Sequence, residues 1–130
     1  MDEFMKKIVL SALLLVAPSV LAVNVILPDD GLYRCGVESW EQVGKRVVKT
    51  GYYGMTGYVS IDNRAVSVKF RDMNISFSPV SKLKSGRLMA YAVDTDQYDI
   101  IISAINGKTQ YMVSNENNPV FLNFSNCIIE

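Results

Sequence analysis

Short segments in which apolar and polar residues alternate one by one constrain the fold of this chain more than any other feature of its sequence. The clearest are residues 65–70 (AVSVKF) and 74–78 (NISFS). Successive side chains of a β-strand point to opposite faces, so a period of two is typical of a strand with one buried face. No stretch of ten or more residues shows a convincing helical period. The pattern therefore predicts an all-β domain.

Strand-like composition continues along the chain, in residues 32–35, 46–49, 52–61, 87–93, 98–105, 109–114 and 120–124. Asn106-Gly107 separates two of these segments, and Asn-Gly is the strongest two-residue hairpin signal because both positions tolerate positive φ. Asp62-Asn63 is a second, weaker turn of this kind. Residues 38–47 stay open between strand and helical turn, since two large apolar residues lie three apart there. We predict a small antiparallel meander barrel or sandwich of about eight strands, closed by one disulfide.

Residues 1–22 have the three parts of a bacterial secretory signal peptide. Lys6 and Lys7 supply the positive region, residues 8–17 form the apolar run, and Val20-Leu21-Ala22 has the small residues of a cleavage site. The run is shorter than the roughly 20 residues of a membrane-spanning helix. We therefore expect a cleaved signal peptide, a single β domain over residues 23–130, a periplasmic or secreted location, and no stable membrane insertion after cleavage.

The chain has two cysteines, Cys35 and Cys127, one near each end of the expected mature domain. Exported proteins meet an oxidising compartment, so we expect these residues to form a disulfide. Closing a loop of about 93 residues removes about 4.6 kcal/mol of unfolded-chain entropy in a simple loop model. Such a bridge favours a closed meander in which the first and last strands are neighbours, with Cys127 just beyond the last strand. Two cysteines without histidine are a poor ligand set, and no metal is expected.

Charge is balanced, with 13 basic and 13 acidic residues, but it is unevenly distributed. Basic side chains predominate in residues 45–87 and acidic ones in residues 94–130. Such asymmetry can mark a partner surface, although the solvated outer face of alternating strands is the more frequent reason. An exported chain without a net positive charge is a poor binder of nucleic acid, and no such partner is expected.

The absence of histidine excludes the usual Ser-His-Asp and Cys-His nucleophile systems and most zinc enzymes. No glycine-rich phosphate loop follows a strand and opens a helix. Asp94, Asp96 and Asp99 could supply a carboxylate pair or a calcium site, but the glycine and the distal glutamate of an EF-hand loop are missing. A solvated loop between strands is the better interpretation of these aspartates. We expect no enzyme activity and no cofactor.

Aromatic residues are concentrated between Trp40 and Tyr58, with Tyr52 and Tyr53 between them. Tyrosine and tryptophan are enriched at interaction hot spots. Tyrosine also favours strands because it packs well there. A core role is therefore favoured over a binding face, and both stay open at this point.

Short motifs at both ends and in the middle of the domain resemble the periplasmic and membrane-bound C-type lysozyme inhibitors. They are Tyr33-Arg34-Cys35, Asn126-Cys127, the alternating segment 66–70 (VSVKF), and Ser85-Gly86 followed by Tyr91 as a lengthened Ser-Gly-x-x-Tyr loop. That family folds as an eight-stranded antiparallel barrel closed by a disulfide, and it inserts a serine loop and a lysine into the lysozyme cleft. The resemblance implies Ser85 as the serine. Asn106 stands where the lysine is expected, which leaves Lys108 as the nearby substitute.

This resemblance leads to a functional hypothesis: an exported, non-enzymatic binding protein, most concretely a periplasmic inhibitor of a lysozyme-like cell-wall hydrolase. A basic loop tip would complement the paired carboxylates of a glycosidase cleft. The expected partner-binding residues are Lys82, Lys84, Ser85, Gly86, Arg87, Tyr91 and Lys108. For the loop itself the alternative is a solvated turn. For the protein, the alternatives are an exported immunity or exclusion factor that binds a toxin or an envelope receptor, and a structural or adhesin-like β module.

Overall fold

The computed structural model describes residues 24–95 and 97–130, without the side chains of residues 52–54. All regular secondary structure in this part of the chain is β-strand, which confirms the all-β prediction. The strands are β1 (Gly31–Val43), β2 (Arg46–Asp62), β3 (Ala65–Phe70), β4 (Met73–Pro79), β5 (Ser81–Lys82), β6 (Leu88–Tyr91), β7 (Tyr98–Ile105), β8 (Lys108–Asn115) and β9 (Asn118–Ile129). Within the described residues no helix is long and apolar enough to cross a membrane. The expected signal peptide lies outside the described residues.

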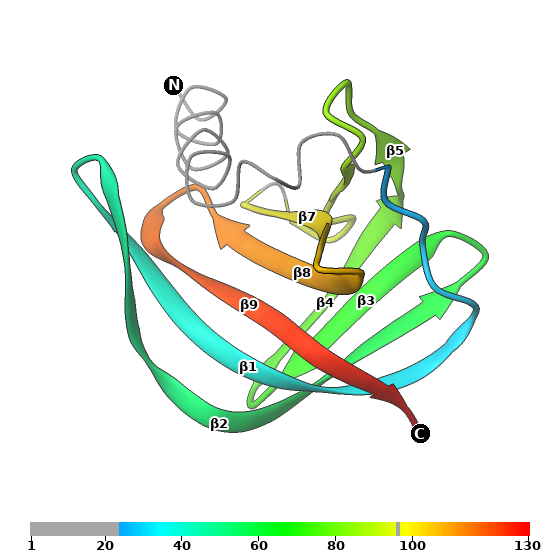
Figure 1. Cartoon of the computed structure of the whole chain (residues 1–130), viewed down its shortest axis with the longest axis horizontal. Coiled ribbons are helices and arrows are strands. Elements are labelled where there is room, and N and C mark those ends of the chain that lie inside the picture. The colour runs from blue at the N-terminus through cyan, green and yellow to red at the C-terminus, as the bar shows by residue number, and fades with distance from the viewer. Residues whose placement is uncertain (1–23, 96) are drawn as a thin grey trace.

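All strands belong to one antiparallel sheet with the order β4-β3-β2-β1-β9-β8-β7-β6-β5. Neighbouring strands are consecutive in the chain except β1 and β9, which pair along most of their lengths. The sheet curls into a nearly closed barrel (Figure 1), and an isolated bridge between Phe77 and Ala92 joins its β4 and β6 sides. The predicted meander, with the first and last strands as neighbours, is confirmed. The β1–β9 pairing lies in the middle of the sheet order, whereas the two edges of the sheet meet through this bridge.

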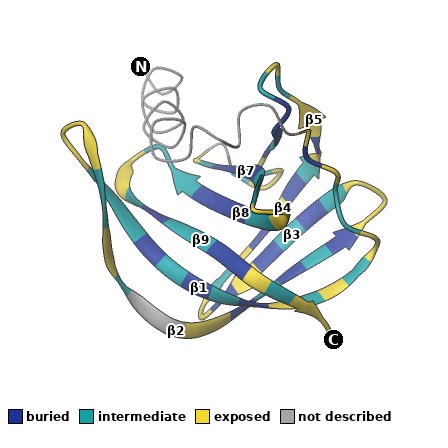
Figure 2. Cartoon of the chain, in the orientation of Figure 1, coloured by how far each residue is buried: buried dark blue, intermediate teal, exposed yellow. Residues whose placement is uncertain are grey.

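The main core fills the barrel interior, because the inward-facing residues of the long strands are apolar. Phe124 is fully buried, and its ring meets that of Phe70 edge to face with centroids 6.4 Å apart. Buried residues alternate with more exposed ones along β1 and β3 (Figure 2). Burying one large apolar side chain contributes about 1.5–3 kcal/mol. The most deeply buried apolar residues are Val37, Val59, Ile61, Val66, Val68, Ile100, Ile102, Tyr111 and Phe124.

The hairpin turn between β7 and β8 forms as predicted. Ile105 pairs with Lys108, so Asn106 and Gly107 are the two turn residues. Their φ angles are 53° and 78°. Two positive φ angles match the right-handed twist of the flanking strands, which is why Asn-Gly is favoured at this place.

The turn between β2 and β3 lies one residue later than predicted. Asp62 pairs with Ala65, so the turn residues are Asn63 and Arg64 rather than Asp62 and Asn63. Arg64 has a φ of 70°, an uncommon conformation for this residue type. Its guanidinium donates to the carbonyl of Val80 at 3.2 Å. This contact to a residue far along the chain helps to hold Arg64 in the turn.

The helical turn considered for residues 38–47 does not form. β1 continues to Val43, and Gly44 turns the chain into β2 with a φ of 61°. The two segments predicted separately at 46–49 and 52–61 are one strand, β2. Its pairing with β1 passes through an irregularity at Ser39 without breaking. The bulge at Ser39 interrupts the one-by-one alternation of apolar residues, which is why the sequence here also allowed a helical turn.

The disulfide joins Cys35 on β1 to Cys127 on β9, with Cα atoms 4.0 Å apart, and the predicted pairing is confirmed. Cys127 does not lie beyond the last strand, because β9 continues to Ile129. The β1–β9 register shifts beside Cys35, and Asn126 has a φ of 54°. This bulge lets β9 run past the bridge and keep its pairing with β1.

Candidate functional site

The basic segment 81–87 lies at one end of the barrel. β6 pairs with β7 from Leu88 opposite Ile102, so the residues before Leu88 lie level with the end of β7 and the turn at 106–107. The turn at 63–64 lies at the same end, since the N–H of Val80, just before β5, donates to the carbonyl of Arg64 at 3.0 Å. We call the turn at 63–64, segment 81–87 and residues 106–108 the loop end of the barrel. The β6–β7 register and the Val80–Arg64 hydrogen bond bring these segments together.

Residues 83–86 form a tight turn that is hydrogen-bonded on both sides. The N–H of Gly86 donates to the carbonyl of Leu83 at 2.9 Å, and the N–H of Leu83 donates to the carbonyl of Arg87 at 2.7 Å. Gly86 has a φ of 90°, a region that glycine enters without steric cost. Its carbonyl accepts a further hydrogen bond, 3.0 Å long, from the segment before β1. Lys84 and Ser85 therefore occupy the two central positions of an ordered turn.

The predicted partner-binding residues separate into two groups. Lys82, Lys84 and Lys108 are exposed and Ser85 is half-buried, and all belong to the loop end. Gly86 and Arg87 are buried. Tyr91 is exposed but lies at the far end of β6, opposite Asp99, five residues after Gly86. At about 3.3 Å per residue this is roughly 16 Å along the strand.

A groove of about 450 Å³ runs beside Lys108 at the loop end, with Tyr33, Tyr111 and Cys127 among its lining residues. The phenol of Tyr111 is almost fully buried. Burial, and then the neighbouring Tyr33, raise the pKa of Tyr111 well above its usual range. Tyr111 is therefore a neutral, packed part of the groove at physiological pH.

Two of the three aspartates considered for carboxylate or calcium chemistry lie in the described part of the chain, and they differ in burial. Asp94 is exposed, as a solvated loop predicts, and Asp96 lies outside the described residues. The interpretation is wrong for Asp99, which is 1% exposed on β7 and accepts a hydrogen bond from the Ser114 hydroxyl at 2.7 Å. Pairing with β8 places Ser114 opposite Asp99. In the described ranges no three potential metal-ligating side chains of His, Cys, Asp or Glu come together.

Sequence reasoning missed a second apolar cluster on the outer face of the barrel. Ile101, Met112 and Phe121 are 3%, 5% and 3% exposed. The signal that could have revealed it is the run of three isoleucines at 100–102, because consecutive apolar residues are typical of a strand buried on both faces. The partly buried residues packed against this cluster are Trp40, Val47, Leu83 and Met89.

The aromatic residues for which a core role and a binding role were both considered differ in their positions. Trp40 packs on the outer cluster, as the favoured core role predicts. Tyr58 is half-buried, and it lines a surface hollow with residues of β2 and β3. The side chains of Tyr52 and Tyr53 lie outside the described part of the chain.

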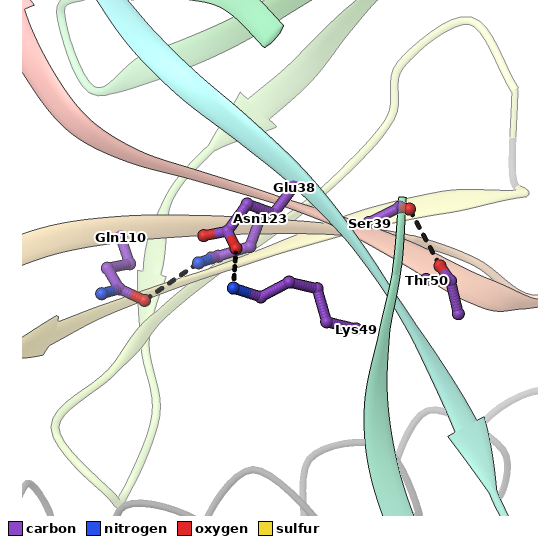
Figure 3. A network of polar contacts seen from close by, with 6 residues as sticks. All are labelled: Glu38, Ser39, Lys49, Thr50, Gln110 and Asn123. Atoms are coloured by element: carbon purple, nitrogen blue, oxygen red, sulfur yellow. Dashed lines mark hydrogen bonds and ion pairs between the residues drawn. The ribbon is translucent and has the colours of Figure 1, made fainter. Parts of the chain in front are cut away.

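A polar network borders this outer cluster. Lys49 forms an ion pair of 2.5 Å with Glu38, and its ammonium lies 5.4 Å from the ring centroid of Trp40. Nearby, the Asn123 amide donates to Gln110 Oε1 at 3.1 Å (Figure 3). Partly exposed ion pairs of this kind contribute about 1 kcal/mol or less to stability. Their main effect is to fix the side chains around Trp40.

No protein-family model, curated protein or solved structure matches this chain. The residues and their geometry are therefore the basis for a functional proposal.

Proposed function

We propose that this chain is an exported, non-enzymatic binding protein whose loop end enters the cleft of a lysozyme-like cell-wall hydrolase and blocks it. One observation carries the proposal. Lys84 and Ser85 occupy the centre of an ordered turn, and Lys108 belongs to the neighbouring hairpin at the same end of the barrel.

The chemistry of the loop end suits a glycosidase cleft. Such a cleft holds two carboxylates, roughly 5–10 Å apart, that flank the bond to be cleaved. Ammonium groups from Lys84 and Lys108 would donate charge-assisted hydrogen bonds to them, and the Ser85 hydroxyl would add a neutral one. The expected contact set is smaller than the sequence indicates, because Gly86 and Arg87 are buried and Tyr91 lies at the other end of β6.

The ordered turn also bears on affinity. Immobilising a flexible loop or side chain on binding costs about 0.5–1.5 kcal/mol for each rotamer-rich side chain. The backbone hydrogen bonds of residues 83–87 restrict the turn before any partner arrives. A preorganised plug of this kind supports inhibition more than it supports a passive structural module.

The test is inhibition of a C-type lysozyme by the purified protein, measured as the rate of cell-wall lysis. We expect inhibition at micromolar concentration or below. Loss of a charge-assisted hydrogen bond costs about 1.5–3 kcal/mol, so Lys84→Ala should weaken inhibition by about tenfold or more. Ser85→Ala and Lys108→Ala should weaken it as well.

Lys69→Ala is the matched control, because Lys69 is an exposed lysine near the β3–β4 turn at the opposite end of the barrel. It should inhibit like the unmutated protein. Absence of inhibition by the unmutated protein at micromolar concentration would refute the proposal. An immunity or exclusion factor would then be the leading hypothesis.

A further inference from the structure

Arg87 lines a pocket on the outer face of the barrel, away from the tip of the loop. The pocket has a volume of about 140 Å³. Its walls are mostly apolar and come from β1, β2, β7, β8 and β9. The apolar wall residues are Trp40, Val47, Ile101, Ile105, Met112 and Phe121.

The guanidinium of Arg87 is the unusual feature of this pocket. Arg87 is only 6% exposed. Its backbone is satisfied, because its carbonyl accepts from Leu83 and its N–H faces the Ser85 hydroxyl at 3.5 Å. Within the described ranges, neither a carboxylate nor a hydrogen-bond acceptor partners the guanidinium. Burial accordingly lowers the pKa of Arg87.

Most of the Arg87 side chain is covered, but its guanidinium nitrogens keep contact with solvent, because none of them is a buried atom without a hydrogen-bond partner. A positive charge with this little access to water favours an anion beside it. The guanidinium stays protonated, because the ordinary pKa of arginine lies far above physiological pH. The pocket therefore combines a fixed positive charge with apolar walls. The ligand that satisfies both has an anionic head and an apolar body.

The shape of the guanidinium and the size of the pocket narrow the choice of ligand. The planar fork of a guanidinium matches a carboxylate, which it binds through two parallel hydrogen bonds. An apolar cavity of about 150 Å³ accommodates a benzene ring, whereas pockets for larger ligands occupy about 300–1,000 Å³. We propose that this pocket binds a monocarboxylate with a compact apolar body of about one six-membered ring, its carboxylate on Arg87 and its body beside Trp40 and Phe121. The site does not depend on inhibition by the loop end.

Trp40 provides a direct assay, because it is the one tryptophan of the chain and lines the pocket. Its fluorescence would be followed while the whole protein is titrated with cyclohexanecarboxylate, cyclohexylmethanol or cyclohexylamine. We expect the carboxylate to bind about tenfold or more tightly than the alcohol, because the alcohol lacks the charge-assisted contact. The amine should bind more weakly than the alcohol.

Two variants test the role of the charge. Arg87→Met keeps an apolar stem of similar length and should remove the preference for the carboxylate. Replacing a buried charge by an apolar residue is often neutral or stabilising, so this variant should fold, and its melting curve checks that. Lys69→Met removes an exposed cation of β3 that is not a wall residue, and it should leave the preference unchanged.

The carboxylate could come from a free acid or from the C-terminus of a chain. Titration with N-acetylphenylalanine and its amide separates these sources. If N-acetylphenylalanine binds more tightly than cyclohexanecarboxylate, the site is assigned to a chain terminus. If it binds more weakly than cyclohexanecarboxylate, the site is assigned to a free acid. Equal affinity for cyclohexanecarboxylate and cyclohexylmethanol would overturn the proposal. So would an unchanged preference in Arg87→Met. If that variant fails to fold, the acid–alcohol comparison on the unmutated protein still decides.

Discussion

Gly57 of β2 lies against buried side chains of the barrel core. A Cβ at this position would lie 2.7 Å from Phe124 Cε2 and 2.7 Å from Val37 Cγ2. It would also lie 3.1 Å from the carbonyl oxygen of Lys69. Carbon atoms in favourable contact are about 3.5–4.0 Å apart. Phe124 and Val37 are both 0% exposed, so neither has free space into which it can move.

The expected effect of Gly57→Ala follows from two opposing terms. Alanine in a strand interior is favoured over glycine by about 0.5–1 kcal/mol, because the unfolded chain has less freedom to lose. Overpacking a close-packed core costs about 1–3 kcal/mol. Two rigid contacts at 2.7 Å place this site in the upper part of that range. We expect the free energy of unfolding to fall by about 1–2 kcal/mol.

Gly36→Ala is the matched control on the paired strand β1. A Cβ there would meet only Ser125 O, at the ordinary distance of 3.6 Å. This variant should be as stable as the unmutated protein or slightly more stable. The difference between the two alanine variants, about 2 kcal/mol, corresponds to roughly 10 °C in melting temperature for a domain of this size.

Urea unfolding followed by circular dichroism measures these free energies. The double variant Gly57→Ala/Phe124→Leu isolates the clash, because leucine has no ring atom at the Cε2 position. We expect the two substitutions together to cost about 1 kcal/mol less than the sum of their separate effects. A Gly57→Ala variant at least as stable as Gly36→Ala would refute this account of the packing.

Three further perturbations test the fold. Replacing Cys35 and Cys127 together by alanine should lower the free energy of unfolding by about 4.6 kcal/mol, because the bridge spans 92 positions of the chain. A urea titration that finds less than about 2 kcal/mol would contradict this entropic reasoning. Gly107→Val should cost about 1–2 kcal/mol through backbone strain alone, since φ is 78° and no atom lies within 4 Å of the new Cβ; an unchanged melting temperature would argue against it. Because the pKa of Tyr111 is raised in the folded protein, its neutral phenol contributes to the free energy of unfolding. This contribution is fully present below about pH 10, where the same phenol ionises in the unfolded chain, and it is lost as the pH rises further. Tyr111→Phe should therefore lose stability less steeply above that pH than the unmutated protein.

Local chemistry was sufficient for several elements of the fold. Alternation over residues 65–70 defines β3 with its bounds, because a strand with one buried face needs no other information. Asn106-Gly107 defines the β7–β8 turn, because few residue pairs accept two positive φ angles. The two cysteines correctly predict both the bridge and the neighbouring first and last strands.

Features that depend on distant parts of the chain could not be read in the same way. The β2–β3 turn includes Arg64, whose side chain bonds a carbonyl that is 16 positions away. Cys127 lies inside β9, because β1 continues to pair with β9 beyond the bridge. The sequence predicts strand faces and turns, but not which partner extends a strand.

The candidate sites show the same division. Composition and the segment SKLKSGR predict a basic loop, and this much is local. Only the fold decides that Lys84 is exposed on the turn while Arg87, three residues later, is buried beside Trp40. The register of β6 on β7 also separates Tyr91 from the loop and brings Lys108 to the same end as Lys84. The physical reason is that periodicity records how one strand divides between two faces, whereas a site is formed where strands far apart in the sequence pair and the sheet closes on itself.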